Sequence, residues 1–151
     1  MNNNLMIFEN PEFGAVRSIL IDGDPWFVAA DVCKALELEK TNRALSRLDD
    51  DEKGAHSVST PGGRQRMSII SESGLYSLIL GSRKPEARAF KRWITHEVIP
   101  SIRKHGAYMT DSLLDALEAH PEAVPEYLNR LRSENARNRE LTRRLRLALP
   151  K

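Results

Sequence analysis

Cysteine is almost absent from this sequence, since Cys33 is the only one among 151 residues. A single thiol excludes an internal disulfide and any metal site built from several cysteines. Its neighbours Val32 and Leu36 are apolar, so we expect a buried structural thiol, because free cysteine behaves as a small hydrophobic side chain. Long apolar runs are lacking too, and none approaches the roughly 18 residues that span a bilayer. The first ten residues have no basic and apolar regions of a secretion signal, so we expect a cytoplasmic chain that meets no membrane.

Catalytic and cofactor motifs are also lacking. The four histidines are scattered: His56, His96, His105 and His120. They form no H-x-x-x-H or H-E-x-x-H spacing, and no glycine-rich phosphate loop is present. Ser71 and Ser73 flank Glu72 at an expected helix start, where capping explains them better than nucleophilic chemistry. Residues 49–51 are three adjacent aspartates, whereas calcium loops use alternating ligands. We therefore expect no enzyme, no cofactor and no metal site.

What the sequence does have is positive charge gathered into one segment. Gly81–His105 holds seven cations and two anions, a local charge of +5 on a chain of net charge +2. Such gathering is typical of a surface that meets phosphates. A helical apolar stripe runs through the segment, formed by Ala87, Phe90, Ile94 and Val98. The cations Lys84, Arg88 and Arg92, flanked by Lys91, lie on another side of that helix, so either they bind phosphate or they form a solvated cationic back.

Prolines set the expected ends of this helix. Pro85 fits the first turn, where its missing N–H is not needed. Pro100 should move Ile99 out of the α region, so the helix should stop or kink near Val98. A short turn should then run to Gly106, a C-cap candidate.

The first fifty residues read as strands followed by two short helices. Leu5–Glu9, Phe13–Ile21 and Pro25–Val28 predict a three-stranded antiparallel start, with a turn at 22–24. Asp31 is an N-cap candidate for a first helix, unless the helix already begins at residue 29 or 30. Thr41 is the N-cap candidate for a second helix through Leu48.

The second helix should point Ala44, Leu45 and Leu48 inward, with Arg43 and Arg47 together on the opposite face. The pair of helices is similar to a helix-turn-helix, whose second helix reads the major groove. Residues 49–53, DDDEK, form either a solvated turn or a set of carboxylates that grip Arg43, Arg47 or Lys53.

A hairpin is predicted over residues 55–70, with its turn at Pro61-Gly62-Gly63. Arg64 and Arg66 are two residues apart, so they project from one face of the second arm. Two readings stay open: a wing that contacts the DNA backbone or a groove, or an exposed hairpin with solubilising arginines.

The chain changes character after Tyr108. Residues 109–126 carry five anions and no cation, whereas residues 129–151 carry eight cations and two anions. Thr110 predicts the start of a short helix, His120-Pro121 its end, and Pro125 the start of a long helix to about Ala148. Two sets of heptad positions can be drawn on that long helix: Leu128, Asn135, Thr142 and Leu149 at a, and Leu131, Asn138 and Leu145 at d. Only four of these seven are apolar, so the helix is either a linker or a weak coiled coil.

Two long stretches resemble one family. PWFVAADVCKALELEKTNRALSRLDDDEKG is similar to the W-F-V-A-x-D-V-C-x-A-L opening and later D-x-x-E-K of the BRO-N domain. SESGLYSLILGSRKPEARAFKRWITHEVIPSIRKHGAYM resembles its second half. BRO-N is the N-terminal domain of phage antirepressors and baculovirus BRO proteins. The resemblance implies a phage or prophage DNA-binding domain that acts in lysogeny control or related regulation and has no catalytic residues.

These observations give one set of expectations. The fold should be α+β, with small antiparallel hairpins packed on several helices, a BRO-N-like domain over residues 1–109 and a helical extension over 110–151. The residues expected to contact double-stranded DNA are cations: Arg43, Arg47, Arg64, Arg66, Arg83, Lys84, Arg88, Lys91 and Arg92. The alternative is a protein-interaction module that binds a phage repressor or another acidic partner and never contacts DNA.

The resemblance also suggests where the protein works and what surrounds the domain. We expect it at the nucleoid of a bacterial host, as a homo-oligomer assembled through the C-terminal helix. In phage antirepressors of this architecture a similar charged helix joins BRO-N to a C-terminal effector domain. The sequence ends about where that domain would begin, so we expect either an N-terminal fragment or a protein without the effector domain.

Overall fold

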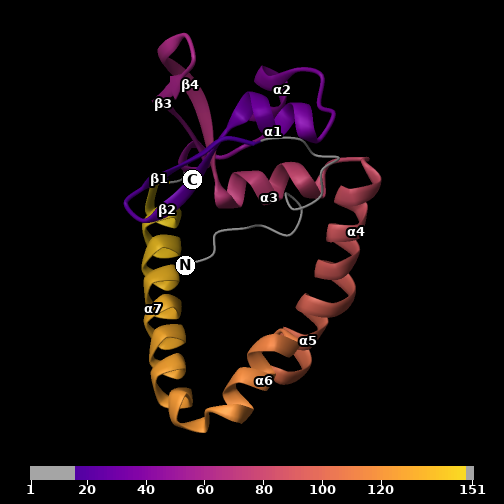
Figure 1. The fold of residues 1–151 in the computed structure, drawn as a ribbon, viewed down its shortest axis with the longest axis vertical. Coiled ribbons are helices and arrows are strands. Elements are labelled where there is room, and N and C mark those ends of the chain that lie inside the picture. Colours follow the sequence, from indigo (N-terminus) through magenta and orange to yellow (C-terminus); the bar gives the residue numbers. More distant parts are fainter. Residues whose placement is uncertain (1–15, 149–151) are drawn as a thin grey trace. The chain divides into compact units, whose positions relative to one another are not determined.

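The computed structural model describes residues 16–148, in which an antiparallel sheet and short helices precede a helical C-terminal part (Figure 1). The strands are β1 (Ser18–Ile21), β2 (Asp24–Val28), β3 (Lys53–Thr60) and β4 (Gly63–Ser71). The helices of the first part are α1 (Ala29–Ala35), α2 (Thr41–Leu45), α3 (Glu72–Leu80), α4 (Pro85–Trp93) and α5 (Ile99–His105), with a 3₁₀ turn η3 (Asp50–Glu52) and a π-helical turn η4 (Ile94–Val98). The later elements are α6 (Asp111–Ala119), the 3₁₀ turn η5 (Pro121–Ala123) and α7 (Val124–Ala148). The expected α+β class is confirmed, while the strand expected at Leu5–Glu9 lies outside the described residues.

The four strands lie in the order β1-β2-β4-β3, and every neighbouring pair is antiparallel. Asp22 and Gly23, with φ of 52° and 84°, make the tight turn between β1 and β2 that the sequence predicted. β2 pairs only with the last three residues of β4, Ile69–Ser71. The rest of the β3–β4 hairpin, residues 55–68, therefore extends beyond the sheet as a two-stranded arm, which Figure 1 shows projecting from the domain.

The core lies between the sheet and helices α1 and α3. Its buried members are mostly aliphatic: Phe27, Ala29, Val32, Cys33, Ala35, Leu36, Ala44, Leu48, Ile70, Leu75, Leu78, Ile79 and Ala87. Cys33 is 1% exposed, so the expected structural thiol is confirmed. Burial raises the pKa of this thiol, which makes the nucleophilic thiolate harder to form.

The start of α1 differs from one of the sequence readings. The helix begins at Ala29 after Val28, so Asp31 lies inside its first turn and is not the N-cap. The Asp31 carboxylate instead accepts three hydrogen bonds from Arg17: from Nε at 2.8 Å, from Nη2 at 3.0 Å and from the backbone N–H at 3.0 Å. The hydrogen bond from the guanidinium is the main reason why the pKa of Asp31 lies below its ordinary value. This pair ties the strand region before β1 to the first helix.

α2 is shorter than predicted. Its N-cap position is Lys40 rather than Thr41, and it ends at Leu45. Ser46 explains the early end, because its hydroxyl donates to the carbonyl of Arg43 at 2.6 Å and offers the backbone an alternative to further α-helical bonds. Looser turns carry the chain on to Leu48, which is buried as expected.

The acidic run after α2 serves the fold rather than the nearby cations. Asp49 and Glu52 form a reciprocal capping box around η3, in which the Glu52 carboxylate accepts from the backbone N–H of Asp49 at 2.9 Å. The other oxygen of Glu52 accepts from the hydroxyl of Ser73 at 2.8 Å, on α3. Lys53 donates to the carbonyl of Leu45 at 3.2 Å. Of the two readings of this run, the one in which its carboxylates grip Arg43, Arg47 or Lys53 is therefore wrong.

Capping starts α3 and α4 as the sequence predicted. The hydroxyl of Ser71 accepts from the N–H of Gly74 at 3.2 Å, and Pro85 occupies the first turn of α4. Of the two outcomes predicted near Val98, the stop is wrong, because η4 and α5 continue the helix. The expectation that Pro100 moves Ile99 out of the α region is also wrong, since Ile99 has φ −63° and ψ −45°. The N–H of Ile99 donates to the carbonyl of Ile94, five residues back, so the π-helical turn widens the helix just before Pro100. The wider turn accommodates Pro100, whose backbone nitrogen has no hydrogen to donate.

A second compact unit begins after Lys104. Gly106, with φ +80°, ends the preceding helix in the left-handed conformation, as the C-cap prediction required. Thr110 accepts from the N–H of Leu113 at 3.2 Å and starts α6, and α7 runs from Val124 to Ala148 as a single helix. These caps confirm the helices expected in the tail. The domain limits of 1–109 and 110–151 stay a prediction about the family.

Candidate nucleic-acid interface

Four of the predicted cations line one shallow groove of about 630 Å³, which we call the α4 groove. They are Arg83 from the turn before α4, and Arg88, Lys91 and Arg92 from the helix itself. Thr95 and His96 extend the same wall into η4. No carboxylate of residues 16–148 lines this groove. Several cations with no anion among them give a positive potential suited to phosphate.

The opposite side of α4 fixes the groove on the domain. Ala87 is fully buried, and the Phe90 ring stacks on Tyr76 of α3 with centroids 5.9 Å apart and an interplanar angle of 16°. Phe90 also meets Trp93 at 5.8 Å in a tilted arrangement. Tyr76 donates to Glu72 at 2.6 Å, and its pKa is raised, mainly by burial and further by the hydrogen bond and charge of Glu72. The apolar stripe predicted for α4 therefore points into the domain at these residues and leaves the cations outside.

Thr95 and His96 are held by the backbone of the preceding turn. The hydroxyl of Thr95 donates to the carbonyl of Lys91 at 2.9 Å, and the Nδ1 atom of His96 lies 3.1 Å from the carbonyl oxygen of Arg92. The sequence reading did not include these two residues. Spacing contains a signal for one of them, since Arg88, Arg92 and His96 are each four residues apart.

Lys84 is used differently from its neighbours. Its ammonium donates to the carbonyl of Ala35, the last residue of α1, at 2.9 Å. The buried hydroxyl of Ser82 donates to the carbonyl of Leu36 at 3.3 Å, and the N–H of Lys84 donates to that hydroxyl at 3.2 Å. We call these bonds of Ser82 and Lys84 the latch. They satisfy carbonyls at the C-terminus of α1, where a cation is also favourable for the helix dipole. Lys84 therefore joins α1 to the start of α4 and is not among the residues that line the α4 groove.

Arg64 and Arg66 lie on the arm, opposite Ser59 and Ser57 of β3. Both are exposed, and their spacing in a regular strand places them on one face, as predicted. The Nη2 atom of Arg64 donates to the carbonyl of Ser57 at 3.3 Å, which directs its guanidinium across the hairpin.

Arg43 and Arg47 share a third place, a groove of about 400 Å³ beside α2. Both are exposed, and Lys40 lines the groove with them. Glu37 and Glu39 line it too, so its charge is mixed. The structure therefore divides the nine predicted residues among the α2 groove, the arm, the α4 groove and the latch at Lys84. Their roles in DNA binding stay predictions.

These features define a small α+β domain with a cationic groove and a projecting arm. Residues 15–100 match the family described as "BRO family, N-terminal domain", Bro-N, over more than half of the chain. The chain therefore belongs to the Bro-N family, and the resemblance seen in its motifs is confirmed.

Three relatives illustrate the range of the family. A protein of Haemophilus influenzae is 40% identical over 107 residues, which are 69% of this chain and 49% of that protein. Bro-N domain-containing protein 289L of Invertebrate iridescent virus 6 is 32% identical over 111 residues, 61% of this chain and 27% of that protein. Bro-N domain-containing protein L2 of Acanthamoeba polyphaga mimivirus is 29% identical over 122 residues, 72% of this chain and 50% of that protein. The chain thus spans about half or less of the length of these relatives, and no solved structure matches it.

Across residues 16–148, no helix combines the length and the apolar character that crossing a bilayer needs.

Proposed function

We propose that this Bro-N chain is a DNA-binding regulator of the antirepressor type, of phage or prophage origin, that contacts duplex DNA and catalyses no reaction. The observation that carries the proposal is the α4 groove, where Arg83, Arg88, Lys91 and Arg92 converge without a lining carboxylate. Phosphate contacts supply most of the affinity of such proteins and set their position on the duplex. In this proposal the α4 groove holds the backbone of one strand.

The arm adds the second part of the proposed interface. A two-stranded β-ribbon fits the major groove of B-DNA, and arginine is the side chain that most often reads guanine there. Arg64 and Arg66 are exposed on such a ribbon. We assign base or groove-edge contacts to them, and to Arg43 and Arg47 of the α2 region a flanking contact.

The aromatic residues favour a duplex over a single strand. Proteins that bind single strands stack successive bases on open aromatic rings. Here Phe90 stacks on Tyr76 beside the core and also meets Trp93, so these rings are already engaged in packing.

The test is duplex binding as a function of salt, measured by fluorescence anisotropy for the parent chain and for Arg88→Ala/Arg92→Ala. Loss of two phosphate contacts should weaken binding to all duplexes alike and flatten the slope of log K against log salt by about one unit per contact. Arg103→Ala/Lys104→Ala is the matched control, because it removes the same charge from α5, outside the α4 groove. Equal slopes in the two double variants would refute the assignment of phosphate to the groove.

Sequence preference is tested separately on the arm. An arginine that contacts guanine in bidentate fashion should cost about 1–3 kcal/mol at one base position when replaced by alanine, and specificity should relax there. The variants are Arg64→Ala and Arg66→Ala, with Arg43→Ala and Arg47→Ala beside them. If all four leave affinity and preference intact, readout does not involve these side chains.

A second candidate function is a protein-interaction module for a phage repressor or another acidic partner. It is favoured by Ile99 and Ile102, which are 55% and 50% exposed on α5 beside the cations Arg103 and Lys104. A surface that mixes apolar and basic side chains suits an acidic protein better than a phosphate backbone. Failure of the purified chain to bind any duplex, at low salt, would select this candidate.

A further inference from the structure

α7 carries a stripe of exposed leucines, which would be more stable buried against a partner than left in water. Leu128, Leu131, Leu141 and Leu145 are 45%, 40%, 50% and 36% exposed. Three of them occupy the inward heptad positions, Leu128 at a and Leu131 and Leu145 at d. The other a and d residues between them are Asn135, Asn138 and Thr142. We call these six a and d residues the seam. Leu141 lies next to it at position g.

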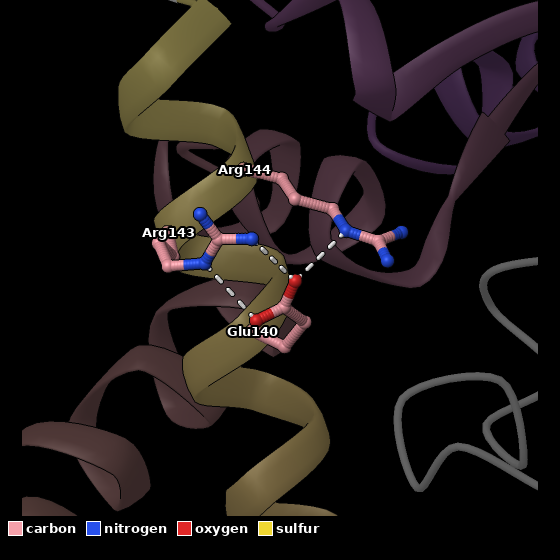
Figure 2. Close-up of polar contacts among 3 residues, drawn as sticks. All are labelled: Glu140, Arg143 and Arg144. Carbon is pink, nitrogen blue, oxygen red and sulfur yellow. Dashed lines mark hydrogen bonds and ion pairs between the residues drawn. The ribbon is translucent and has the colours of Figure 1, made fainter.

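Two clusters of ion pairs lie on the side of α7 away from the seam. Glu126 accepts from Arg130 at 2.8 Å, one turn apart. Glu140 holds two guanidinium groups, with Arg143 Nη2 at 2.8 Å and Arg144 Nε at 3.1 Å, and Figure 2 shows both turned towards its carboxylate. These acids occupy position f, and the arginines positions b and c. Their charges are therefore paired within one helix, where a partner on the seam would not meet them.

The charges beside the seam are arranged differently. Position e holds arginine in three successive heptads: Arg132, Arg139 and Arg146. None of the ion pairs found within residues 16–148 engages these three side chains. Position g holds Tyr127, Glu134 and Leu141. One edge of the seam is thus uniformly cationic, whereas the other has an acid at its centre.

This asymmetry distinguishes the two ways in which a second copy of α7 can pack on the seam. In an antiparallel pair position e faces position e of the partner, so rows of arginine meet and repel. In a parallel pair position g faces position e of the next heptad of the partner. Glu134 then meets the partner's Arg139, twice by symmetry, while Tyr127 and Leu141 face arginines without repulsion.

We propose that α7 pairs with α7 of a second copy of this chain as a parallel, in-register, two-stranded coiled coil over about residues 124–146. Asn135 at an a position supports this choice, since a buried asparagine at a specifies register and a two-stranded state at a cost in stability. Asn138 at d lowers the stability further, so the dimer dissociates on dilution. The inference does not depend on DNA binding. The proposed dimer is closed by a two-fold axis and contains two Bro-N domains, one from each copy.

The first experiment reverses the charges in the full chain and measures the dimer dissociation constant by sedimentation equilibrium. Glu134→Arg and Arg139→Glu should each weaken the parallel dimer by about five- to twenty-fold, because two attractive pairs become repulsive. The double variant should recover most of the affinity. In an antiparallel pair Arg139→Glu would instead strengthen association, since it would face arginine. Ser133→Glu at the outward position f is the matched control and should change the constant little.

The second experiment reports orientation. In a Thr142→Cys variant the two new cysteines face each other across a parallel seam and should form a disulfide on mild oxidation. In an antiparallel pair centred on the seam they would lie about 16 Å apart along the axis, at 1.5 Å per residue. The parent chain is the control, because its single thiol, Cys33, is buried. A chain that stays monomeric at high concentration would overturn the proposal. So would stronger association of Arg139→Glu together with no crosslink in the Thr142→Cys variant.

Discussion

Replacing Gly74 by alanine tests how closely η3 packs on α3. Alanine normally stabilises a helix interior by up to about 1 kcal/mol relative to glycine. At this position a Cβ atom would lie 2.8 Å from the carbonyl oxygen of Glu52 and 3.3 Å from Leu48 Cδ1. The obstacle is backbone, so η3 must move away from the helix. Overpacking of this kind costs about 1–3 kcal/mol, which outweighs the gain in helix propensity. We expect Gly74→Ala to lose about 1–2 kcal/mol of unfolding free energy.

Gly81→Ala is the matched control, because it makes the same change at the other end of α3. There a new Cβ would meet only the carbonyls of Leu78 and Ser77, both at 3.7 Å, an ordinary contact. Gly81 has φ −92°, which alanine tolerates, so this variant should be neutral or gain about 0.4–1 kcal/mol by restricting the unfolded chain. Each kcal/mol shifts the melting temperature of a domain this size by about 4–8 °C. Thermal unfolding followed by circular dichroism should therefore separate the two variants clearly. Equal melting temperatures would show that the contact of η3 with α3 yields without strain.

Three other outcomes follow from polar groups and burial. Arg17 lowers the pKa of Asp31, so the stabilisation from this pair is present above the unfolded pKa of about 4 and is lost as the pH falls through the folded pKa. The difference in unfolding free energy between the parent and Asp31→Asn should therefore shrink in acid. A difference that is independent of pH would contradict this. Lys84→Met should lose about 1 kcal/mol in urea unfolding, through its bond to Ala35, yet leave the salt slope of DNA binding unchanged, whereas a flattened slope would return Lys84 to the phosphate contacts. Cys33 should react with a thiol reagent only as fast as the domain opens, and rapid labelling of the native chain would contradict its burial.

Local signals in the sequence predicted several caps and turns correctly, although the N-cap position of α2 is Lys40 and not Thr41. Ser71, Pro85, Gly106 and Thr110 each do what their residue type favours, because a cap depends only on neighbours three or four residues away. The charge on α4 was readable for a similar reason, since helical spacing alone separates the cations from the apolar stripe.

Partners distant in the sequence were not predictable from such signals. Asp31 is of a residue type that favours N-caps, but its carboxylate binds Arg17, which lies fourteen residues away and comes near only in the folded sheet. Lys84 read as one more cation of the basic segment, and its acceptor at Ala35 is forty-nine residues away. Spacing cannot show which of several identical charges the fold will use for itself.

The π-helical turn has an evolutionary reading. A turn of this kind holds one residue more than an α-turn, so η4 is equivalent to a single-residue insertion in a helix. Deleting one residue between Ile94 and Val98 would turn this wide turn into a regular α-helical turn and leave the helix after it in nearly the same orientation. Pro100 would then meet a regular helical turn with no place for its ring. Relatives that lack a proline at this position are therefore free to lack the extra residue, and an alignment gap of one should accompany the loss of Pro100.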